Sequence, residues 1–292
     1  MADSPYAPSS DRETGLSDKD FQKLSEFIYE QCGIKMPPSK KTMLEARMQK
    51  RLRTLGMSSF REYCNWVLDP VASDNELINF IDIVTTNKTD FFREPSHFEY
   101  LVSTAIPEMV RGEGAGVRRK LMVWSAGCST GEEPYTLCMV LSEFAERYPG
   151  LNFDFSVLAT DISTRVLEKA ASAIYEGEKT DPIPMNLKKK YLLRSKDRSQ
   201  NLVRIVPELR SKVRFRRINF MDNEFGLREK MDIIFCRNVI IYFDRPTQER
   251  LINKFCRNLI PGGYLMVGHS ETLNSLNVPV VQVSPTIYRM PQ

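Results

Sequence analysis

The sequence has few of the residues that build metal sites and disulfide frameworks. It holds two histidines, His97 and His269, which lie far apart, and six cysteines, no two of which form a C-x-x-C pair. This spacing predicts neither a zinc site nor a disulfide framework. A reduced, cytoplasmic setting is the simplest expectation, and no metal is expected.

Long apolar runs and signal patterns are also missing. No stretch approaches the ~20 apolar residues that a membrane-spanning helix needs, so no membrane insertion is expected. The N-terminus has no basic start followed by an apolar run and is not a secretory signal. Residues 1–15 are polar and rich in Ser and Pro, which predicts a disordered tail. The net charge of +4 does not demand a nucleic-acid partner.

The first part of the chain has helical spacing of its apolar residues. A helix is expected to begin at Ser17 or Asp18, and Gly56 is a plausible cap for a later one. The other expected helices are 40–56, 58–68 and 75–87. Together they predict a small all-helical domain, residues 16–88.

Strands and helices alternate after about residue 118. The expected strands are 121–124, 151–161, 212–220, 230–238 and 261–270. The expected helices are 132–148, 163–175 and 245–259. This order predicts an α/β domain, residues 89–292, with a mostly parallel, doubly wound sheet. Residues 176–211 interrupt the alternation with two short β-prone pieces, which predicts a small inserted antiparallel β-subdomain.

The loop after the first expected strand allows a hydrolase interpretation. Residues 127–131 read GCSTG, which matches the pattern of a nucleophilic serine at Ser129. His269 lies downstream with Asp232 and Asp244 between, in the order that the hydrolase fold uses. However, this is the first strand of the sheet, and no Gly-rich segment upstream would complete an oxyanion hole. The sequence therefore weighs against a hydrolase.

The same loop also fits a cofactor pocket. Neither G-x-G-x-x-G nor G-K-[ST] is present, and the acidic start of the next helix, Glu132 and Glu133, would repel a pyrophosphate. That start suits a ligand with hydroxyls or a positive group. Asp161 ends the second strand, where a carboxylate can accept hydrogen bonds from a ribose. With the L-x-P-G-G-x-L turn at 259–265, these features are typical of the class I S-adenosylmethionine-dependent methyltransferase fold.

Five separated motifs closely resemble, in one order, the CheR chemotaxis receptor methyltransferases. They are TTNKTDFFREPSHF (85–98), WSAGCSTGEEPYTL (124–137), LATDIS (158–163), FCRNVIIYFD (235–244) and GHSET (268–272). The resemblance implies methyl transfer from S-adenosylmethionine to glutamates of chemoreceptors (methyl-accepting chemotaxis proteins) in sensory adaptation, forming glutamyl methyl esters and S-adenosylhomocysteine. It also implies a monomer whose partners are the cytoplasmic helices of chemoreceptors.

The resemblance assigns the site residues position by position. The cofactor-binding residues would be Asn87, Thr89, Arg93, Ala126, Glu133, Asp161, Asn219, Phe220, Arg237 and Asn238. Glu133 would take the methionyl ammonium and Asp161 the ribose, whereas Asn219 and Phe220 would flank the adenine. Arg93 and Tyr242 would act at the reaction centre. A glutamate acceptor is already ionised at pH 7, so no general base is required.

Two further segments concern the partner. The helix 40–56 is basic, and the resemblance implies that Arg47, Arg51 and Arg53 engage the acidic methylation helices of the receptor. The segment 176–211 resembles the family's β-subdomain, which in some members adds a receptor's C-terminal peptide as an extra strand. Its turn, RSKDRSQN, lacks the glycines expected in a peptide-tethering version, which counts against tethering.

Two other functions remain open. A cofactor-sensing or scaffold protein of the same fold would have lost activity, and the intact Asn87, Arg93, Glu133, Asp161, Asn238 and Tyr242 argue against it. A nucleic-acid methyltransferase could use the basic helix. Its usual [DNS]-P-P-[YFW] signature is absent, because the corresponding strand ends in CRNVIIYF.

Overall fold

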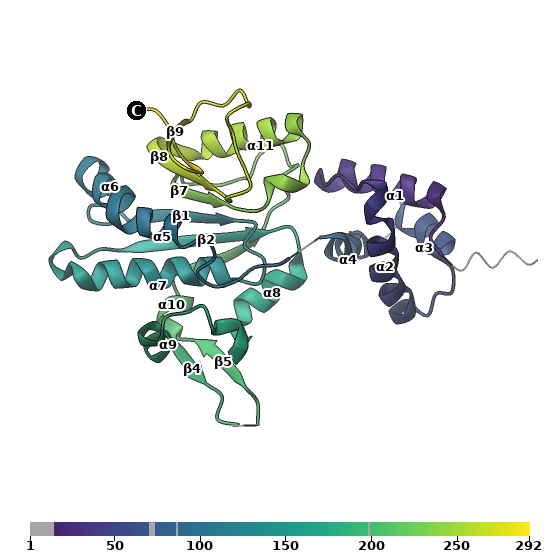
Figure 1. Cartoon of the computed structure of the whole chain (residues 1–292), viewed down its shortest axis with the longest axis horizontal. Helices are drawn as coiled ribbons and strands as arrows, with labels where there is room; N and C mark the ends of the chain where they lie inside the picture. The colour runs from purple at the N-terminus through teal and green to yellow at the C-terminus, as the bar shows by residue number, and fades with distance from the viewer. Residues whose placement is uncertain (1–14, 70–73, 86, 198) are drawn as a thin grey trace, which may run out of the picture. The chain divides into compact units, whose positions relative to one another are not determined.

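The computed structural model describes residues 15–69, 74–85, 87–197 and 199–292 (Figure 1). The chain divides into two compact units, Met1–Val84 and Thr85–Gln292. The predicted tail, residues 1–15, lies outside the described residues except for Gly15. In the part of the chain that is described, no helix is both long and apolar enough to cross a membrane.

The first unit is helical, as the sequence predicts. It contains α1 (Asp18–Cys32), the 3-10 turn η1 (Pro38–Lys40), α2 (Lys41–Leu55), α3 (Phe60–Val67) and α4 (Asp74–Val84). Ser17 caps α1, since its side chain accepts a hydrogen bond from the Asp20 N–H, and Gly56 ends α2 with a left-handed φ of 69°. The start of α1 and the end of α2 therefore follow from their capping residues.

The second unit is built on a seven-stranded sheet in the order β6-β2-β1-β7-β8-β10-β9. The strands are β1 (Leu121–Ala126), β2 (Phe155–Asp161), β6 (Val213–Arg217), β7 (Met231–Cys236), β8 (Leu259–Val267), β9 (Val281–Ser284) and β10 (Ile287–Arg289). The first five are parallel, and β10 and β9 add antiparallel pairs. The predicted doubly wound α/β class is confirmed, although the two last strands were not predicted.

Helices cover both faces of this sheet (Figure 1). Trp124 of β1 packs against Phe255 of α11 (Arg245–Asn258). Its neighbour Val123 belongs to the core that includes Leu137 of α7 (Glu132–Arg147). Because successive strand residues point to opposite faces, the two helices cover opposite sides. The helix α8 (Thr164–Ser172) follows β2.

A helical run precedes β1 that the sequence did not predict. It consists of α5 (Ser96–Tyr100), the π-helical turn η2 (Leu101–Ala105) and α6 (Ile106–Glu113). Its buried residues Phe98, Leu101 and Ile106 join the core of the second unit. The run thereby ties the segment 87–95 to the sheet.

The predicted inserted sheet is present, with three antiparallel strands in the order β3-β5-β4. The strands are β3 (Ile174–Glu176), β4 (Leu192–Arg194) and β5 (Leu202–Ile205), and the short helices η4 (Gly177–Thr180), α9 (Met185–Tyr191) and α10 (Pro207–Arg210) accompany them. The strand β3 occupies residues whose spacing predicts the end of a helix. Ala173 has a left-handed φ of 55° and stops α8 before that point.

The strand order predicts a ligand-binding crevice at the carboxyl ends of the central strands. The chain passes from β1 to β2 on one side, whereas β7 pairs with β1 on the other. Ligands of open α/β sheets bind where the strand order reverses in this way. The loops after β1, β2, β6 and β7 therefore border the predicted ligand site.

Candidate active site

The loop after β1 is held by backbone contacts to the end of β2. The N–H groups of Gly127 and Cys128 both donate to the Thr160 carbonyl at 2.8 Å, and Ser129 N donates to Asp161 Oδ2 at 2.9 Å. Gly131 has φ 96°, and a Cβ there would lie 2.9 Å from the Ala170 Cβ. A Cβ at Gly127 would likewise lie 2.5 Å from Val239 Cγ2, so backbone geometry explains the two glycines of GCSTG.

The hydrolase interpretation is not supported by this geometry. Ser129 Oγ donates to the Asn87 carbonyl at 3.0 Å, whereas His269 Nε2 lies 3.3 Å from Ser96 Oγ. Asp232 pairs with Arg119, and Asp244 caps α11 by accepting from Thr247 N. The serine, histidine and acids of the sequence pattern thus have other partners.

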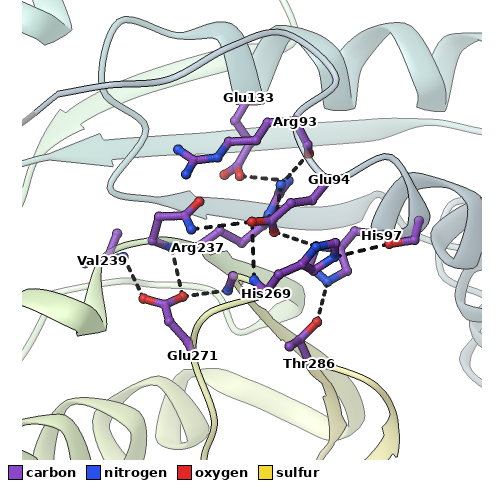
Figure 2. Close-up of polar contacts among 12 residues, drawn as sticks. Arg93, Glu94, His97, Glu133, Arg237, Val239, His269, Glu271 and Thr286 are labelled. Atoms are coloured by element: carbon purple, nitrogen blue, oxygen red, sulfur yellow. Dashed lines mark hydrogen bonds and ion pairs between the residues drawn. The ribbon is translucent and has the colours of Figure 1, made fainter.

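Arg237, the residue after β7, lies between the segment of Arg93 and Glu94 and the start of α7. Its side chain is 2% exposed. Its Nε and Nη2 donate to Glu94 Oε2 at 3.2 and 3.1 Å, and its Nη1 lies 3.3 Å from Glu133 Oε2 (Figure 2). Nη2 also donates to the Arg93 carbonyl, and the guanidinium lies over the Phe98 ring. One buried cation therefore joins two carboxylates from separate segments.

Glu133 lies in the first turn of α7, next to Arg237. Its side chain is 15% exposed, and its Oε1 accepts a hydrogen bond from Ser125 Oγ at 2.7 Å. Burial raises the pKa of Glu133, against the opposing effects of Arg237 and of the Ser125 hydrogen bond. The helix N-terminus also favours the ionised form. A carboxylate fixed in this way can receive a cationic ligand group.

Glu94 was not singled out from the sequence, although it lies inside the FFREPSHF motif. Besides Arg237, it accepts hydrogen bonds at Oε1 from His269 N at 3.2 Å and from Asn238 Nδ2 at 3.4 Å. Burial acts to raise the pKa of Glu94, but Arg237 and the His269 N–H outweigh it, and the net pKa is lowered. Its left-handed φ of 56° is the local signal of a constrained position.

Comparisons with known proteins decide the family. Residues 87–288 match the family model described as "CheR methyltransferase, SAM binding domain", and residues 19–85 match "CheR methyltransferase, all-alpha domain". The chain belongs to the CheR family. It is 37% identical over 274 residues to a "Chemotaxis protein methyltransferase" of Borreliella burgdorferi, covering 94% of this chain and 95% of that one. The identity to an Escherichia coli protein of the same description is 37% over 275 residues, covering 94% and 92%.

The predicted family and cofactor are thereby confirmed: this CheR protein is a methyltransferase that uses S-adenosylmethionine. The residues at the crevice fit that cofactor. Glu133 offers a negative charge to an ammonium or sulfonium. Asp161 uses its two oxygens for Ser129 N and Ser163 N, but a carboxylate has about four acceptor positions and can still serve a ribose.

The predicted adenine residues follow β6, on the far side of β2. Asn219 is half-buried, and its Oδ1 accepts from Met221 N at 3.0 Å. The Phe220 ring makes edge contacts with Phe225 and Phe255. Ala126, the last residue of β1, is buried and stands opposite Thr160. These positions lie at or just after the ends of two strands, β1 and β6.

The predicted reaction-centre residues come from two loops. Arg93 precedes Glu94, its Nη1 donates to the Lys88 carbonyl at 3.2 Å, and its charge acts on Glu133 to lower the pKa of that carboxyl. Figure 2 shows its guanidinium beside the Glu133 carboxylate. Thr89 is half-buried in the same segment, and Tyr242 ends the 3-10 turn η5 (Ile240–Tyr242) after β7. The roles of all these residues stay predictions.

Phe91 and Phe92 are packing residues of the segment 85–98. Phe91 is 1% exposed and belongs to the core, where it makes an edge contact with Tyr175. Phe92 packs against the same core and contacts the Phe98 ring. The two rings anchor the segment that carries Arg93 and leave its polar side chains to the crevice.

Two histidines flank the Glu94 carboxylate. Ligand atoms of Glu94, His97 and His269 lie within 4.8 Å of one another. The Glu94 oxygen nearest to His97 Nδ1, at 3.6 Å, is the one that Arg237 already binds. A divalent cation would have to displace or repel that buried guanidinium, so we assign no metal to these residues.

His97 should make stability depend on pH. Burial lowers the pKa of His97 from 6.5 to about 4, and Arg237 acts in the same direction. The unfolded chain therefore binds a proton at His97 near pH 6.5, whereas the folded protein binds it only near pH 4. The free energy of unfolding therefore decreases as the pH is lowered from 6.5 to 4. Urea unfolding should show a loss of roughly 2–3 kcal/mol from this group between pH 7 and pH 4.5.

The matched variants are His97→Gln and His269→Gln. The first should remove this part of the pH dependence, whatever its effect on stability at pH 7. The second alters an exposed side chain and should leave the dependence in place. An equal pH dependence in wild type and His97→Gln would contradict the prediction.

The three arginines predicted to meet a receptor differ in their surroundings. Arg47 Nη1 donates to the last two carbonyls of α4, at 3.0 and 3.2 Å. Arg51 forms an ion pair with Glu76, which is 3% exposed. These two side chains fasten α2 to α4, whereas Arg53 is exposed. The receptor role stays a prediction for all three, and the structure favours Arg53 for it.

Proposed function

We propose that this enzyme methylates glutamate side chains of chemoreceptors, forming glutamyl methyl esters. The observation that carries the proposal is the 37% identity, over almost the whole chain, to proteins described as chemotaxis protein methyltransferases. The charges of the crevice agree with it. The half-buried Arg93 beside Glu133 gives an acceptor carboxylate a cation to pair with.

The proposed reaction needs no general acid or general base from the protein. A carboxylate oxygen of the acceptor attacks the methyl carbon, the C–O bond forms, and the C–S bond breaks with its electrons returning to sulfur. The products are the ester and S-adenosylhomocysteine, and no proton moves. The chain therefore contributes position and exclusion of water. This agrees with an interior histidine, His97, whose pKa is lowered away from neutral pH.

The proposed roles follow the loops of the crevice. Glu133 takes the methionyl ammonium, Asp161 the ribose, and Asn219 with Phe220 the adenine. Asn87, Thr89, Ala126, Arg237 and Asn238 complete the cofactor pocket. Arg93 orients the carboxylate that is to be methylated, and Tyr242 steers it with its hydroxyl. The partners would be the cytoplasmic helices of receptors, which places the enzyme in the cytoplasm.

The test is transfer of a tritiated methyl group to membranes that carry chemoreceptors. We expect label on the receptor band, and volatile methanol after mild base, as an ester requires. Excess S-adenosylhomocysteine should suppress the label. Label that survives base would exclude a glutamyl ester, and label on added nucleic acid with none on receptors would favour the other methyltransferase class.

Arg53→Glu should weaken receptor recognition. If the exposed Arg53 meets acidic receptor helices, reversing its charge should raise the KM for receptor several-fold at low salt. The effect should fade towards 0.5 M salt, because exposed charges are screened. The control is Arg228→Glu, an equal reversal at an exposed position before β7. Equal KM values for both variants across salt concentrations would contradict a role for Arg53.

A further inference from the structure

Glu271 is a buried carboxylate with four backbone donors. It lies in the loop after β8, and the residue is 4% exposed. Its Oε2 accepts hydrogen bonds from Asn238 N at 2.8 Å and Gly268 N at 2.5 Å. Its Oε1 accepts from Val239 N at 2.8 Å and Ile241 N at 3.3 Å (Figure 2). Three of the four donors belong to the segment that follows β7.

The three donors precede the hydrogen bonds of the 3-10 turn η5, the first of which runs from Tyr242 N to the Val239 carbonyl. Asn238 leaves β7 with a left-handed φ of 58°, an uncommon conformation for a residue other than glycine. Its N–H and that of Val239 turn inward, and a buried N–H without a partner is costly. The Glu271 carboxylate supplies those partners from 30 to 33 residues further along the chain.

The two loops are also packed closely at Gly268. A Cβ at this position would lie 2.6 Å from Asn238 Nδ2 and 2.8 Å from Asn238 N. Asn238 Nδ2 in turn donates to Glu94 Oε1 at 3.4 Å. The loop after β8 therefore packs directly against Asn238, the residue that follows Arg237.

The segment 238–242 carries residues that the proposed function uses. Asn238 belongs to the proposed cofactor pocket and Tyr242 to the reaction centre. Ile241 between them has 48% of its surface exposed while its N–H is held by Glu271. The loop must hold the side chains of Asn238 and Tyr242 at fixed positions, and the Glu271 carboxylate fixes its backbone.

We propose that Glu271 is a positioning residue for methyl transfer, whose carboxylate fixes the backbone of 238–241 so that Asn238 meets the cofactor and Tyr242 the acceptor. The part concerning Tyr242 rests on the proposed function, and the part concerning Asn238 rests only on cofactor binding. Glu271 touches neither ligand in this scheme and acts through the loop.

The contacts require a carboxylate and exclude an amide. Each oxygen accepts from two N–H groups, so a glutamine of the same shape must turn its NH₂ group towards two donors. Glu271→Gln therefore changes the loop with almost no change of volume. Glu271→Asp keeps the charge but draws it back by one methylene, so it should partly restore the function lost in Glu271→Gln.

The experiment compares Glu271→Gln with Glu249→Gln in the full chain. Glu249 Oε2 also accepts a backbone hydrogen bond, from Asn277 N at 2.9 Å, but on α11. Calorimetry with S-adenosylhomocysteine, receptor methylation kinetics and thermal unfolding are measured for each variant. For Glu271→Gln we expect about tenfold weaker product binding and a kcat about 100-fold lower, since small misplacements near the reacting atoms have effects of that size. Glu249→Gln should match wild type.

The outcomes separate this proposal from the proposed function. Wild-type affinity and kcat in Glu271→Gln would overturn the positioning role of Glu271. A loss of activity no larger than the loss of folded protein would also overturn it, because the role would then be merely structural. If wild type binds S-adenosylhomocysteine but methylates no receptor, the glutamate acceptor is wrong. In that case tenfold weaker binding by Glu271→Gln supports the Asn238 part, and unchanged binding overturns it.

Discussion

Glu133→Ala is expected to weaken binding of S-adenosylhomocysteine about 100-fold. The proposed contact joins the Glu133 carboxylate to the methionyl ammonium, and a hydrogen bond to a charged group contributes about 1.5–3 kcal/mol. Glu133 is already oriented by Ser125 Oγ and Arg237, so its position at the start of α7 is fixed before the ligand arrives. Isothermal calorimetry at pH 7 measures the effect.

A second ligand separates the proposed contact from general damage to the loop. 5′-Methylthioadenosine has the ribose and adenine but no ammonium, so wild type and Glu133→Ala should bind it with similar affinity. The matched variant is Ser129→Ala, which loses only the hydrogen bond from Oγ to the Asn87 carbonyl and should weaken product binding by less than tenfold. If Ser129→Ala weakened product binding more than Glu133→Ala, the result would favour Ser129 as a nucleophile again.

Arg237→Met is expected to lower the free energy of unfolding at pH 7 by about 3–5 kcal/mol. The variant would leave the carboxylates of Glu94 and Glu133 in the interior without the cation that both contact. Removing one partner of a buried ion pair costs more than the pair itself contributes, because the remaining charges stay desolvated. Loss of cofactor binding should accompany the loss of stability.

The loss of stability in Arg237→Met should depend on pH. Without Arg237 the pKa values of Glu94 and Glu133 rise, so these carboxylates take up protons more readily and the stability deficit should shrink as the pH is lowered. Arg289→Met is the control. Arg289 also pairs with a glutamate, Glu108 at 3.0 Å, and lies over a ring, Tyr264, but it is 33% exposed. Its loss should cost about 1 kcal/mol or less, and equal deficits for the two variants would contradict the argument.

Local signals were enough for most helices and for the parallel strands. Ser17, Gly56 and Asp244 act as caps where their side-chain chemistry or conformational freedom predicts. The buried run at 121–126 reads as a strand since every residue is apolar or small. By contrast, β9 is only four residues long and has exposed side chains along most of its length, so its pairing with β10 defines it.

The basic helix shows where a local pattern misleads. From the sequence, Arg47 and Arg51 are equivalent to Arg53, because all three belong to one charged segment. Only the fold of the first unit shows that α4 offers carbonyls to Arg47 and a buried carboxylate to Arg51. A charge on a helix is a surface feature only when no neighbouring element supplies it with a partner.

The sequence by itself determined the family, the cofactor and the small-residue loop, because each depends on residue types within short motifs. The tertiary structure alone decided which carboxylates share which donors. Glu94 reaches Arg237 across 143 residues, and Glu271 reaches Asn238 across 33. Such contacts depend on strand order and on loop backbone that turns N–H groups inward. No periodicity encodes them, so the polar network of the crevice appears only when the strands are assembled.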